Sequence, residues 1–199
     1  LGGTDWGAID LPMARRAVKR AWEMGITVFD TADVYGLGKS EEELSKALGS
    51  KRHEAFIITK FGVAWKSNTM GKRAKTYFDS SPRHLIISLE SSLRRLKVDA
   101  IPLYLIHWPD PKTDLNDTMD VLEKVRKEGK ILNYGLSNFG IDVMQKVAGK
   151  YSISSVQGSY SLLEWQLNDP VFRLANRCGL ACFSYGSLGQ GILTGKFKQ

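Results

Sequence analysis

Several features that define large classes of protein are scarce in this sequence of 199 residues. No stretch approaches the roughly 18 to 20 consecutive apolar residues that span a bilayer, so we expect no membrane-spanning helix. The first residues do not combine a charged segment with an apolar one, and we expect no signal peptide. Only two cysteines are present, Cys178 and Cys182, and they form neither a disulfide framework nor a metal-ligand spacing. These absences predict a cytoplasmic protein without a bound metal, whose cysteines are reduced and partly buried.

Positive charge predominates in this sequence, which has a net charge of +7 and a pI near 9.4. Such a balance suits nucleic acid, an acidic membrane surface, or a phosphorylated cofactor or substrate. The basic residues are spread over many segments, with one denser group at Lys66, Lys72, Arg73 and Lys75. No recognised nucleic-acid-binding motif accompanies them. We therefore predict solvated helix faces and one basic loop, with neither nucleic acid nor membrane as a partner. An anionic sugar phosphate is the alternative ligand of that loop, and the sequence does not indicate the oligomeric state.

What the sequence does contain is an alternation of short apolar runs with amphipathic helices, at intervals of roughly 30 residues. Pro12 and Ser81–Pro82 indicate helix starts, because proline suits the first turn and serine the N-cap. Ser40 with Glu43 predicts a capping box for a helix that ends near Gly49. The six predicted strands are 26–31, 55–61, 103–107, 133–138, 154–159 and 181–184.

Repeated strand–helix units require a parallel sheet covered by helices. No GxGxxG motif follows an early strand, so an open dinucleotide-binding sheet has no positive support. Polar residues instead follow the carboxyl ends of successive strands, where the active site of a closed (β/α)8 TIM barrel is built. Six units are visible where a barrel needs eight. We therefore expect residues 1–199 to form a single but incomplete α/β barrel domain, with the first and eighth strands largely absent. The strand-end residues are Asp30, Lys60, His107, Asn138, Gln157 and Tyr185.

Three of these strand ends carry side chains suited to carbonyl reduction. FDTADVYG places Asp30 and Tyr35 five residues apart, ITKFG contains Lys60, and LIHWPD contains His107. Taken singly, a helix-capping aspartate, a solvated lysine and a structural histidine are the commoner readings. At successive strand ends of one barrel, however, the four side chains converge on one mouth.

Their chemistry is complementary, because a phenol with an ordinary pKa near 10 is a poor acid at neutral pH. A neighbouring ammonium, held by a buried carboxylate, favours release of the phenol proton. Asp30, Lys60 and Tyr35 form that relay, and a histidine beside them can hydrogen-bond the substrate oxygen. Asp33 is a competing partner for Lys60, but its place in the middle of the motif makes Asp30 the preferred one.

The segments FDTADVYG, ITKFG, LIHWPD, GLSNFG and YGSLGQGILTGK, in this order, resemble the aldo-keto reductase family over essentially the whole chain. The resemblance implies Tyr35 as proton donor, Lys60 and Asp30 as its tuning pair, and His107 as the residue that orients the substrate. It also implies NADPH as the cofactor. NADH is the alternative. The site for the adenosine 2′-phosphate, the group that distinguishes NADPH from NADH, would lie around the eighth strand, which is largely absent from this chain.

The resemblance further assigns a cofactor-binding set to the second half of the chain. Where the family commonly has Tyr-Ser-Pro-Leu, this chain has Tyr185-Gly186-Ser187-Leu188, so a serine donor is lost or displaced to Ser187. By resemblance, three residues hold the nicotinamide carboxamide, one aromatic residue stacks on its ring, and three lie along the pyrophosphate. In that order they are Ser137, Asn138 and Gln157; Tyr185; and Gly186, Leu188 and Gln190.

Substrate identity is less constrained by the sequence. Trp6, Trp65 and Trp108 lie in or beside segments expected at the barrel mouth and predict an aromatic-lined pocket for a small carbonyl compound. The main hypothesis is an NADPH-dependent reductase of aldehydes, ketones or sugars. Two alternatives are a cofactor-binding regulatory subunit of the same fold and an inactive truncated form.

Overall fold

The computed structural model describes residues 9–66, 74–166 and 169–197. The chain divides into two compact units: unit 1 is Leu1–Asn133 and unit 2 is Tyr134–Gln199. All six predicted strands are present, with ends that differ from the prediction by no more than two residues. The expectation of a single domain stays a prediction.

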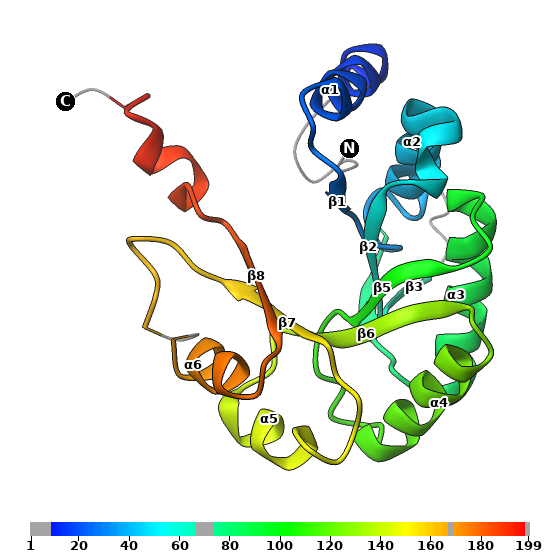
Figure 1. The fold of residues 1–199 in the computed structure, drawn as a ribbon, viewed down its shortest axis with the longest axis vertical. Helices are drawn as coiled ribbons and strands as arrows, with labels where there is room; N and C mark the ends of the chain where they lie inside the picture. The colour runs from blue at the N-terminus through cyan, green and yellow to red at the C-terminus, as the bar shows by residue number, and fades with distance from the viewer. Residues whose placement is uncertain (1–8, 67–73, 167–168, 198–199) are drawn as a thin grey trace. The chain divides into compact units, whose positions relative to one another are not determined.

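Unit 1 contains three parallel strands in the order β1-β2-β5. Asp30 is in register with Ile58, and Lys60 with Leu105, so these neighbouring strands run side by side to their carboxyl ends. Figure 1 shows helices α2, α3 and α4 along one side of these strands. The elements of unit 1 are α1 (Leu11–Glu23), β1 (Val28–Asp30), α2 (Lys39–Leu48), the 3-10 helix η2 (Gly49–His53), β2 (Phe56–Phe61), β3 (Val63–Trp65), β4 (Thr76–Phe78), α3 (Pro82–Leu96), β5 (Ile101–Ile106) and α4 (Leu115–Lys127).

Two predicted helix starts are confirmed. α1 begins with Pro12 in its first turn, after Asp10, whose carboxylate accepts from Met13 N at 2.9 Å. α3 begins at Pro82, after the N-cap Ser81. Both starts combine a capping acceptor with the backbone conformation that proline already favours.

The predicted capping box of α2 is wrong. α2 begins after Gly38, which has a φ of +92° and supplies no side-chain cap. The Ser40 hydroxyl instead lies 2.8 Å from the hydroxyl of Thr31. Glu43 accepts from Lys46 at 2.8 Å and pairs with Arg15 of α1 at 2.7 Å. The motif failed because both side chains have tertiary partners that a local pattern does not contain.

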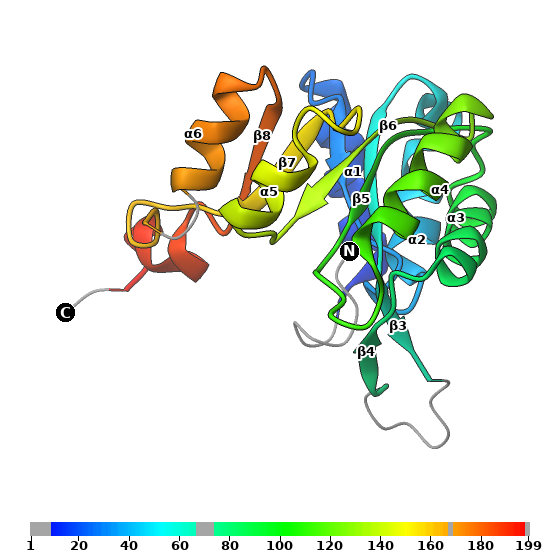
Figure 2. The ribbon, with the colours of Figure 1, turned by 90° about the horizontal axis from the view of Figure 1, so that it is seen from below.

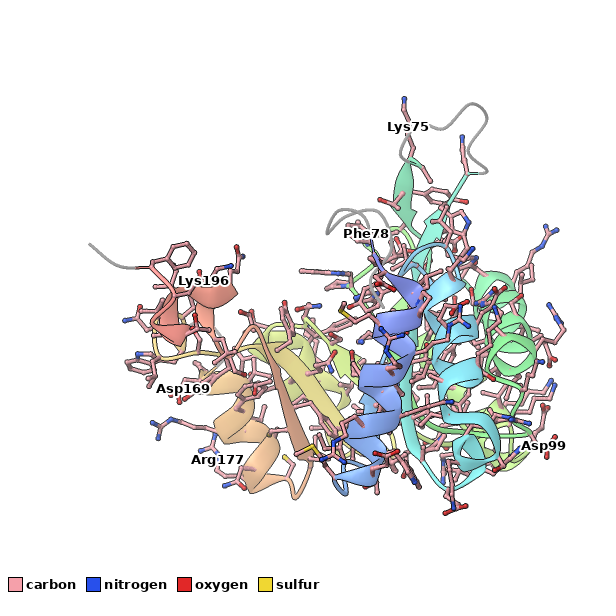
Figure 3. All side chains as sticks on the ribbon, turned by 90° about the horizontal axis from the view of Figure 1, so that it is seen from above. Lys75, Phe78, Asp99, Asp169, Arg177 and Lys196 are labelled. Carbon is pink, nitrogen blue, oxygen red and sulfur yellow. The ribbon has the colours of Figure 1, made fainter. Side chains whose placement is uncertain are left out.

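The sequence did not predict the antiparallel pair β3–β4, which follows β2 directly. Figure 2 shows it projecting away from α2 and α3. In Figure 3, Lys75 lies toward the tip of this hairpin and Asp99 at the opposite end of unit 1. Lys66 and Lys75 are exposed, as expected of a solvated basic segment, whereas Lys72 and Arg73 lie outside the described residues.

The core of unit 1 lies between this sheet and its helices. β2 and β5 are buried almost throughout, as parallel strands covered by helices usually are. Phe61 and Tyr104 stack across the two strands with ring centroids 4.9 Å apart. The core side chains contributed by α3 and α4 include Leu85, Leu89, Leu96, Met119, Leu122 and Val125.

Unit 2 contains β7 paired in parallel with both β6 and β8. Cys178 and Cys182 are both exposed thiols, so the expectation that they are partly buried is wrong. Within the residues that the structure describes, none of the helices has the length and apolar character needed to span a membrane. The elements are β6 (Ile131–Ser137, which crosses the boundary between the units), α5 (Ile141–Val147), β7 (Ser155–Ser159), α6 (Asp169–Arg177), β8 (Ala181–Tyr185) and the 3-10 helix η3 (Gly189–Thr194).

Candidate active site

Lys60 is a buried cation at the end of β2, with 1% of its surface exposed. Its ammonium donates to Asp30 Oδ1 at 2.6 Å and to the backbone oxygen of Thr31 at 2.8 Å. The parallel register of β1 and β2 brings these groups together, because both strands end at the same edge of the sheet. The contact between Lys60 and Asp30, which the sequence favoured over one with Asp33, is present.

Tyr35 and His107 complete the cluster in unit 1. Tyr35 lies in the loop between β1 and α2, and the Lys60 ammonium is 5.3 Å from the centroid of its ring. His107 directly follows β5, and its ring meets that of Tyr35 edge-on at 5.7 Å. The structure therefore brings together all four side chains that the strand ends predicted, Asp30 included.

Burial dominates the electrostatics of this cluster. It lowers the pKa of Lys60, and the carboxylate of Asp30 opposes that shift. Burial, aided by the positive charge of Lys60, lowers the pKa of His107 to about 3. His107 is therefore a neutral imidazole at physiological pH, able to donate or accept a hydrogen bond without carrying charge.

Aromatic side chains lie beside His107. The Trp108 ring is 6.5 Å from the His107 ring, and Trp108 is 39% exposed. Phe78 of β4 lies 6.4 Å from Trp108. Trp65 is half-buried on β3, and Trp6 lies outside the described residues. The sequence reasoning missed Phe78, which belongs to the Thr76–Phe78 run of strand-forming residues after the basic segment.

Asp110 of the LIHWPD segment anchors the loop that follows His107. Its carboxylate accepts from the backbone N–H of Ser80 at 2.9 Å and from that of Lys112 at 2.9 Å. The Thr113 hydroxyl adds a third contact at 2.6 Å. These bonds lower the pKa of Asp110 against the opposing effect of desolvation, and they connect the loop to the chain leaving β4.

In unit 2, four of the predicted cofactor-binding residues form a hydrogen-bonded chain. Ser137 of β6 is in register with Gln157 of β7, and its hydroxyl lies 3.4 Å from the Gln157 amide oxygen. The Asn138 amide donates to the Ser137 hydroxyl at 3.1 Å. The Tyr185 hydroxyl at the end of β8 donates to the amide oxygen of Asn138 at 2.7 Å. The structure thus groups these side chains at the carboxyl ends of three parallel strands.

The remaining predicted residues follow β8 in a tight turn. Gly186 has a φ of +66° and Gln190 a φ of +53°, while Leu188 is 60% exposed. The Ser187 hydroxyl lies 3.2 Å from that of Ser184. A left-handed glycine after Tyr185 lets the backbone turn sharply at the strand end. The turn is closed by backbone bonds from Gly189 N to Gly186 O and from Gly191 N to Leu188 O, and it carries the Ser184–Ser187 hydroxyl pair directly beside Tyr185 in the chain.

A model of the family described as "Aldo/keto reductase family" matches residues 1–199. Curated relatives include the aldo-keto reductase YhdN of Bacillus subtilis, 34% identical over all of this chain and 59% of its own length. The aldo-keto reductase yakc [NADP(+)] of Schizosaccharomyces pombe is 31% identical over 89% of this chain and 53% of its own. The NADH-specific methylglyoxal reductase of Escherichia coli is 30% identical over 98% and 62%. The chain spans roughly 60% of the length of these relatives.

Among solved structures, the glycerol dehydrogenase AKR11B4 of Gluconobacter oxydans matches all of this chain and 60% of its own. The identity is 35% and the TM-score 0.91. This likeness confirms the predicted fold class: the chain is part of an α/β barrel of the TIM type.

Proposed function

This chain belongs to the aldo/keto reductase family, and on that premise we propose that it reduces the carbonyl of an aldehyde, ketone or sugar. The hydride comes from a reduced nicotinamide cofactor and the proton from Tyr35. One observation carries the proposal: Lys60, 1% exposed, lies between the carboxylate of Asp30 at 2.6 Å and the ring of Tyr35 at 5.3 Å.

That arrangement suits proton donation by a phenol. A positive charge beside a phenol favours the phenolate and so makes the phenol a stronger acid. Burying the ammonium of Lys60 strengthens its field at Tyr35, because little water screens it. Asp30 keeps the buried lysine charged, which desolvation alone would oppose.

His107 is suited to hold the substrate oxygen. Its ring lies 5.7 Å from that of Tyr35, and its lowered pKa keeps it neutral. A neutral imidazole can donate one hydrogen bond to a carbonyl oxygen without competing for the proton that Tyr35 delivers. Trp108 and Phe78 beside it supply apolar surface for the rest of the substrate.

The residues of unit 2 fit a nicotinamide carboxamide. Ser137, Asn138 and Gln157 offer amide and hydroxyl groups, the donors and acceptors that a carboxamide needs. The Tyr185 ring suits stacking, with its hydroxyl fixed by Asn138. Gly186, Leu188 and Gln190 would lie along the pyrophosphate. When bound, the reduced nicotinamide supplies the hydride, and these residues set which ring face it presents.

NADPH is the cofactor we propose, with NADH as the alternative. The printed names of two relatives differ on this point, one specifying NADP(+) and the other NADH. A regulatory subunit that binds the cofactor without rapid turnover is the second reading of the same residues. Lys66 and Lys75 are exposed, and we propose that they are solvated rather than bound to a phosphate group of the substrate.

The test pairs cofactor titration with turnover. Fluorescence titration with NADPH and with NADH gives the two dissociation constants, and Tyr35→Phe should leave both nearly unchanged. The same variant should lose carbonyl reduction by about 100-fold or more, the usual contribution of a general acid. Tyr151→Phe, which removes a phenol in unit 2, is the matched control and should retain activity. Undiminished carbonyl reduction by Tyr35→Phe would exclude Tyr35 as the acid. If the wild-type protein bound neither NADPH nor NADH, the proposed hydride transfer would be excluded.

A further inference from the structure

The loop that carries Tyr35 runs from the end of β1 to the start of α2, and a pair of hydroxyl groups joins its two ends. Thr31 directly follows β1, and its hydroxyl lies 2.8 Å from the hydroxyl of Ser40 in the first turn of α2. Thr31 is 1% exposed and Ser40 3% exposed. We call these two side chains the loop-closing pair. Because both hydroxyls are buried, loss of one would leave the other without an easy replacement partner.

Thr31 connects the loop-closing pair to Lys60. Its backbone oxygen accepts from the Lys60 ammonium at 2.8 Å. Its backbone N–H donates to the backbone oxygen of Ile58 on β2 at 2.8 Å. The backbone of Thr31 is therefore fixed to β2 on both sides of the residue. Its position defines where the loop begins relative to the buried ammonium.

Ser40 connects the loop-closing pair to Tyr35. Its backbone N–H donates to the backbone oxygen of Tyr35 at 3.2 Å. The first N–H groups of a helix have no partner within the helix, so the Tyr35 carbonyl satisfies one of these donors of α2. Ser40 thus contacts Tyr35 through its backbone and Thr31 through its side chain. Together, the two residues of the pair link the Lys60 ammonium to the Tyr35 backbone by consecutive hydrogen bonds.

The backbone of this loop requires support from outside it. Leu37, two residues after Tyr35, has a φ of +55°, a left-handed conformation that is unfavourable for a residue with a side chain. Such conformations persist where the surrounding contacts fix the chain. The backbone N–H of Asp33 supplies one contact, to the backbone oxygen of Lys60 at 3.2 Å. That bond holds the first half of the loop, and the loop-closing pair holds its return to α2.

We propose that Thr31 and Ser40 are positioning residues that hold Tyr35 beside Lys60 through their paired hydroxyls. With the pair intact, the Lys60 ammonium stays 5.3 Å from the centre of the Tyr35 ring, where its charge favours release of the phenol proton. Without the pair, the loop samples positions that take the phenol away from the ammonium, and the field weakens with distance. The inference rests on the function proposed above, in which Tyr35 delivers the proton.

The first variant is Ser40→Ala, which removes one hydroxyl and keeps the N–H that bonds to Tyr35. Its kcat for carbonyl reduction should fall about 10-fold, with KM and cofactor affinity changed by less than about twofold, because the acid is misplaced rather than the ligands. Tyrosinate absorption is followed against pH, and the Tyr35 signal is isolated by subtracting the curve of the same protein carrying Tyr35→Phe. That signal should move to higher pH by about half a unit or more. Coincident curves for Ser40→Ala and wild type would overturn the proposal.

Ser45→Ala is the matched control, because it also removes a buried serine hydroxyl from α2. The Ser45 hydroxyl donates to the backbone oxygen of Leu96 at 2.8 Å, away from the loop, and Ser45 is 3% exposed, as Ser40 is. The two variants should therefore lose similar stability in chemical denaturation. Only Ser40→Ala should change kcat and the tyrosinate curve. Equal changes in both variants would mean that Ser40 contributes stability alone, and the positioning role would be rejected.

Thr31→Val and Thr31→Ser test the pair from its other member. Valine keeps the shape of threonine without the hydroxyl, whereas serine keeps the hydroxyl. Thr31→Val should therefore reproduce the effects of Ser40→Ala, and Thr31→Ser should resemble wild type. The double variant Thr31→Val/Ser40→Ala should lose no more kcat than either single variant, because the two hydroxyls form one contact. Losses that multiply would show that the hydroxyls act separately, contrary to the proposal.

A further measurement uses the wild-type protein alone. Hydrogen exchange followed by NMR should find the Ser40 amide protected to the same degree as that of Leu44 in the middle of α2, because a closed loop keeps its bond to Tyr35. Fast exchange at Ser40 would show that the loop opens readily. That result would refute the positioning role even if none of the variants folds.

Neither the tyrosinate curves nor hydrogen exchange requires cofactor or turnover, so the two proposals can fail separately. A protein that shows the tyrosinate shift in Ser40→Ala but reduces no carbonyl retains the positioning role and loses the proposed function. A protein that reduces carbonyls but shows no shift retains the function and loses the role of the loop-closing pair.

Discussion

Lys60 and Asp30 form an ion pair at 2.6 Å in which the lysine side chain is 2% exposed and the aspartate 40%. Water can therefore solvate the charge of Asp30 but not the charge of Lys60. An unpaired Asp30 would still be solvated, whereas an unpaired Lys60 would be a buried charge. The pair thus depends on Asp30 to keep Lys60 charged, and the proposed chemistry depends on that charge.

Replacing Lys60 by Met should suppress carbonyl reduction by about 100-fold or more while the protein remains folded. Methionine fills the buried space of the lysine stem but places no charge beside Tyr35. The measurement is kcat/KM across pH, and the remaining activity should lose the pH dependence attributed to Tyr35. Lys127→Met, at an exposed position of α4, is the control and should match wild type. Equal rates for the two variants would remove Lys60 from the mechanism.

His107 should remain uncharged in the folded protein down to acidic pH. Its contribution to the free energy of unfolding should therefore become unfavourable as the pH falls. The folded pKa of about 3 lies below the unfolded value of about 6.5. As pH falls from 7 to 4, the unfolded chain takes up a proton that the folded chain does not, so this group favours unfolding increasingly. Relative to His107→Gln, wild type should therefore lose about 3 kcal/mol of unfolding free energy over that range. Denaturant unfolding at pH 4 and pH 7 measures the difference.

His53→Gln provides the comparison for the acid effect, because His53 is exposed on η2. Its stability relative to wild type should change little between the same two pH values. A similar pH dependence in both variants would mean that His107 titrates like a solvated histidine, and the argument for a neutral imidazole beside Tyr35 would fail.

Gly38 and Gly25 offer a matched pair of positions for testing the ion pair between Arg95 of α3 and Glu41 of α2, which is 2.6 Å long. Both have left-handed backbones, with φ of +92° and +88°. A Cβ at Gly38 would lie 2.7 Å from Arg95 Cδ, whereas a Cβ at Gly25 would meet nothing within 4 Å. Gly25→Ala should therefore cost only the backbone strain, about 1 to 2 kcal/mol. Gly38→Ala should cost about 1 to 3 kcal/mol more, because the Arg95–Glu41 pair must shift. Equal losses in chemical denaturation would show that Arg95 moves aside without penalty.

The sequence predicted strand ends well because hydrophobic runs and breaker residues are local signals. Asp30, Lys60 and His107 could be found in this way, since each stands where an apolar run stops. Position in the chain was a poor guide to burial: Asp33 looked like a loop residue but is 1% exposed. Nothing near it in the sequence indicates that Glu41 of α2 and Arg95 of α3 lie close enough to influence its pKa.

Ser40 and Glu43 show that a local sequence motif can also predict a contact that the folded protein does not make. Their spacing matches a capping box, yet Ser40 contacts Thr31 and Glu43 pairs with Arg15 and Lys46. A local motif competes with tertiary partners whose sequence separation hides them. The hairpin β3–β4 was missed because its three-residue strands are too short for a periodic signal.

Tyr185→Phe should weaken cofactor binding by about fivefold, which corresponds to roughly 1 kcal/mol for one hydrogen bond. The ring that would stack on the nicotinamide is kept, but the 2.7 Å bond that orients the Asn138 amide is lost. Burial raises the pKa of Tyr185, so its hydroxyl stays protonated and can donate at neutral pH. Tyr185→Leu removes the ring as well and should bind more weakly still. Tyr160→Phe is the control, because the Tyr160 ring packs against Phe172. Cofactor fluorescence titrations measure all three variants, and equal affinities for wild type and Tyr185→Leu would exclude Tyr185 from the nicotinamide site.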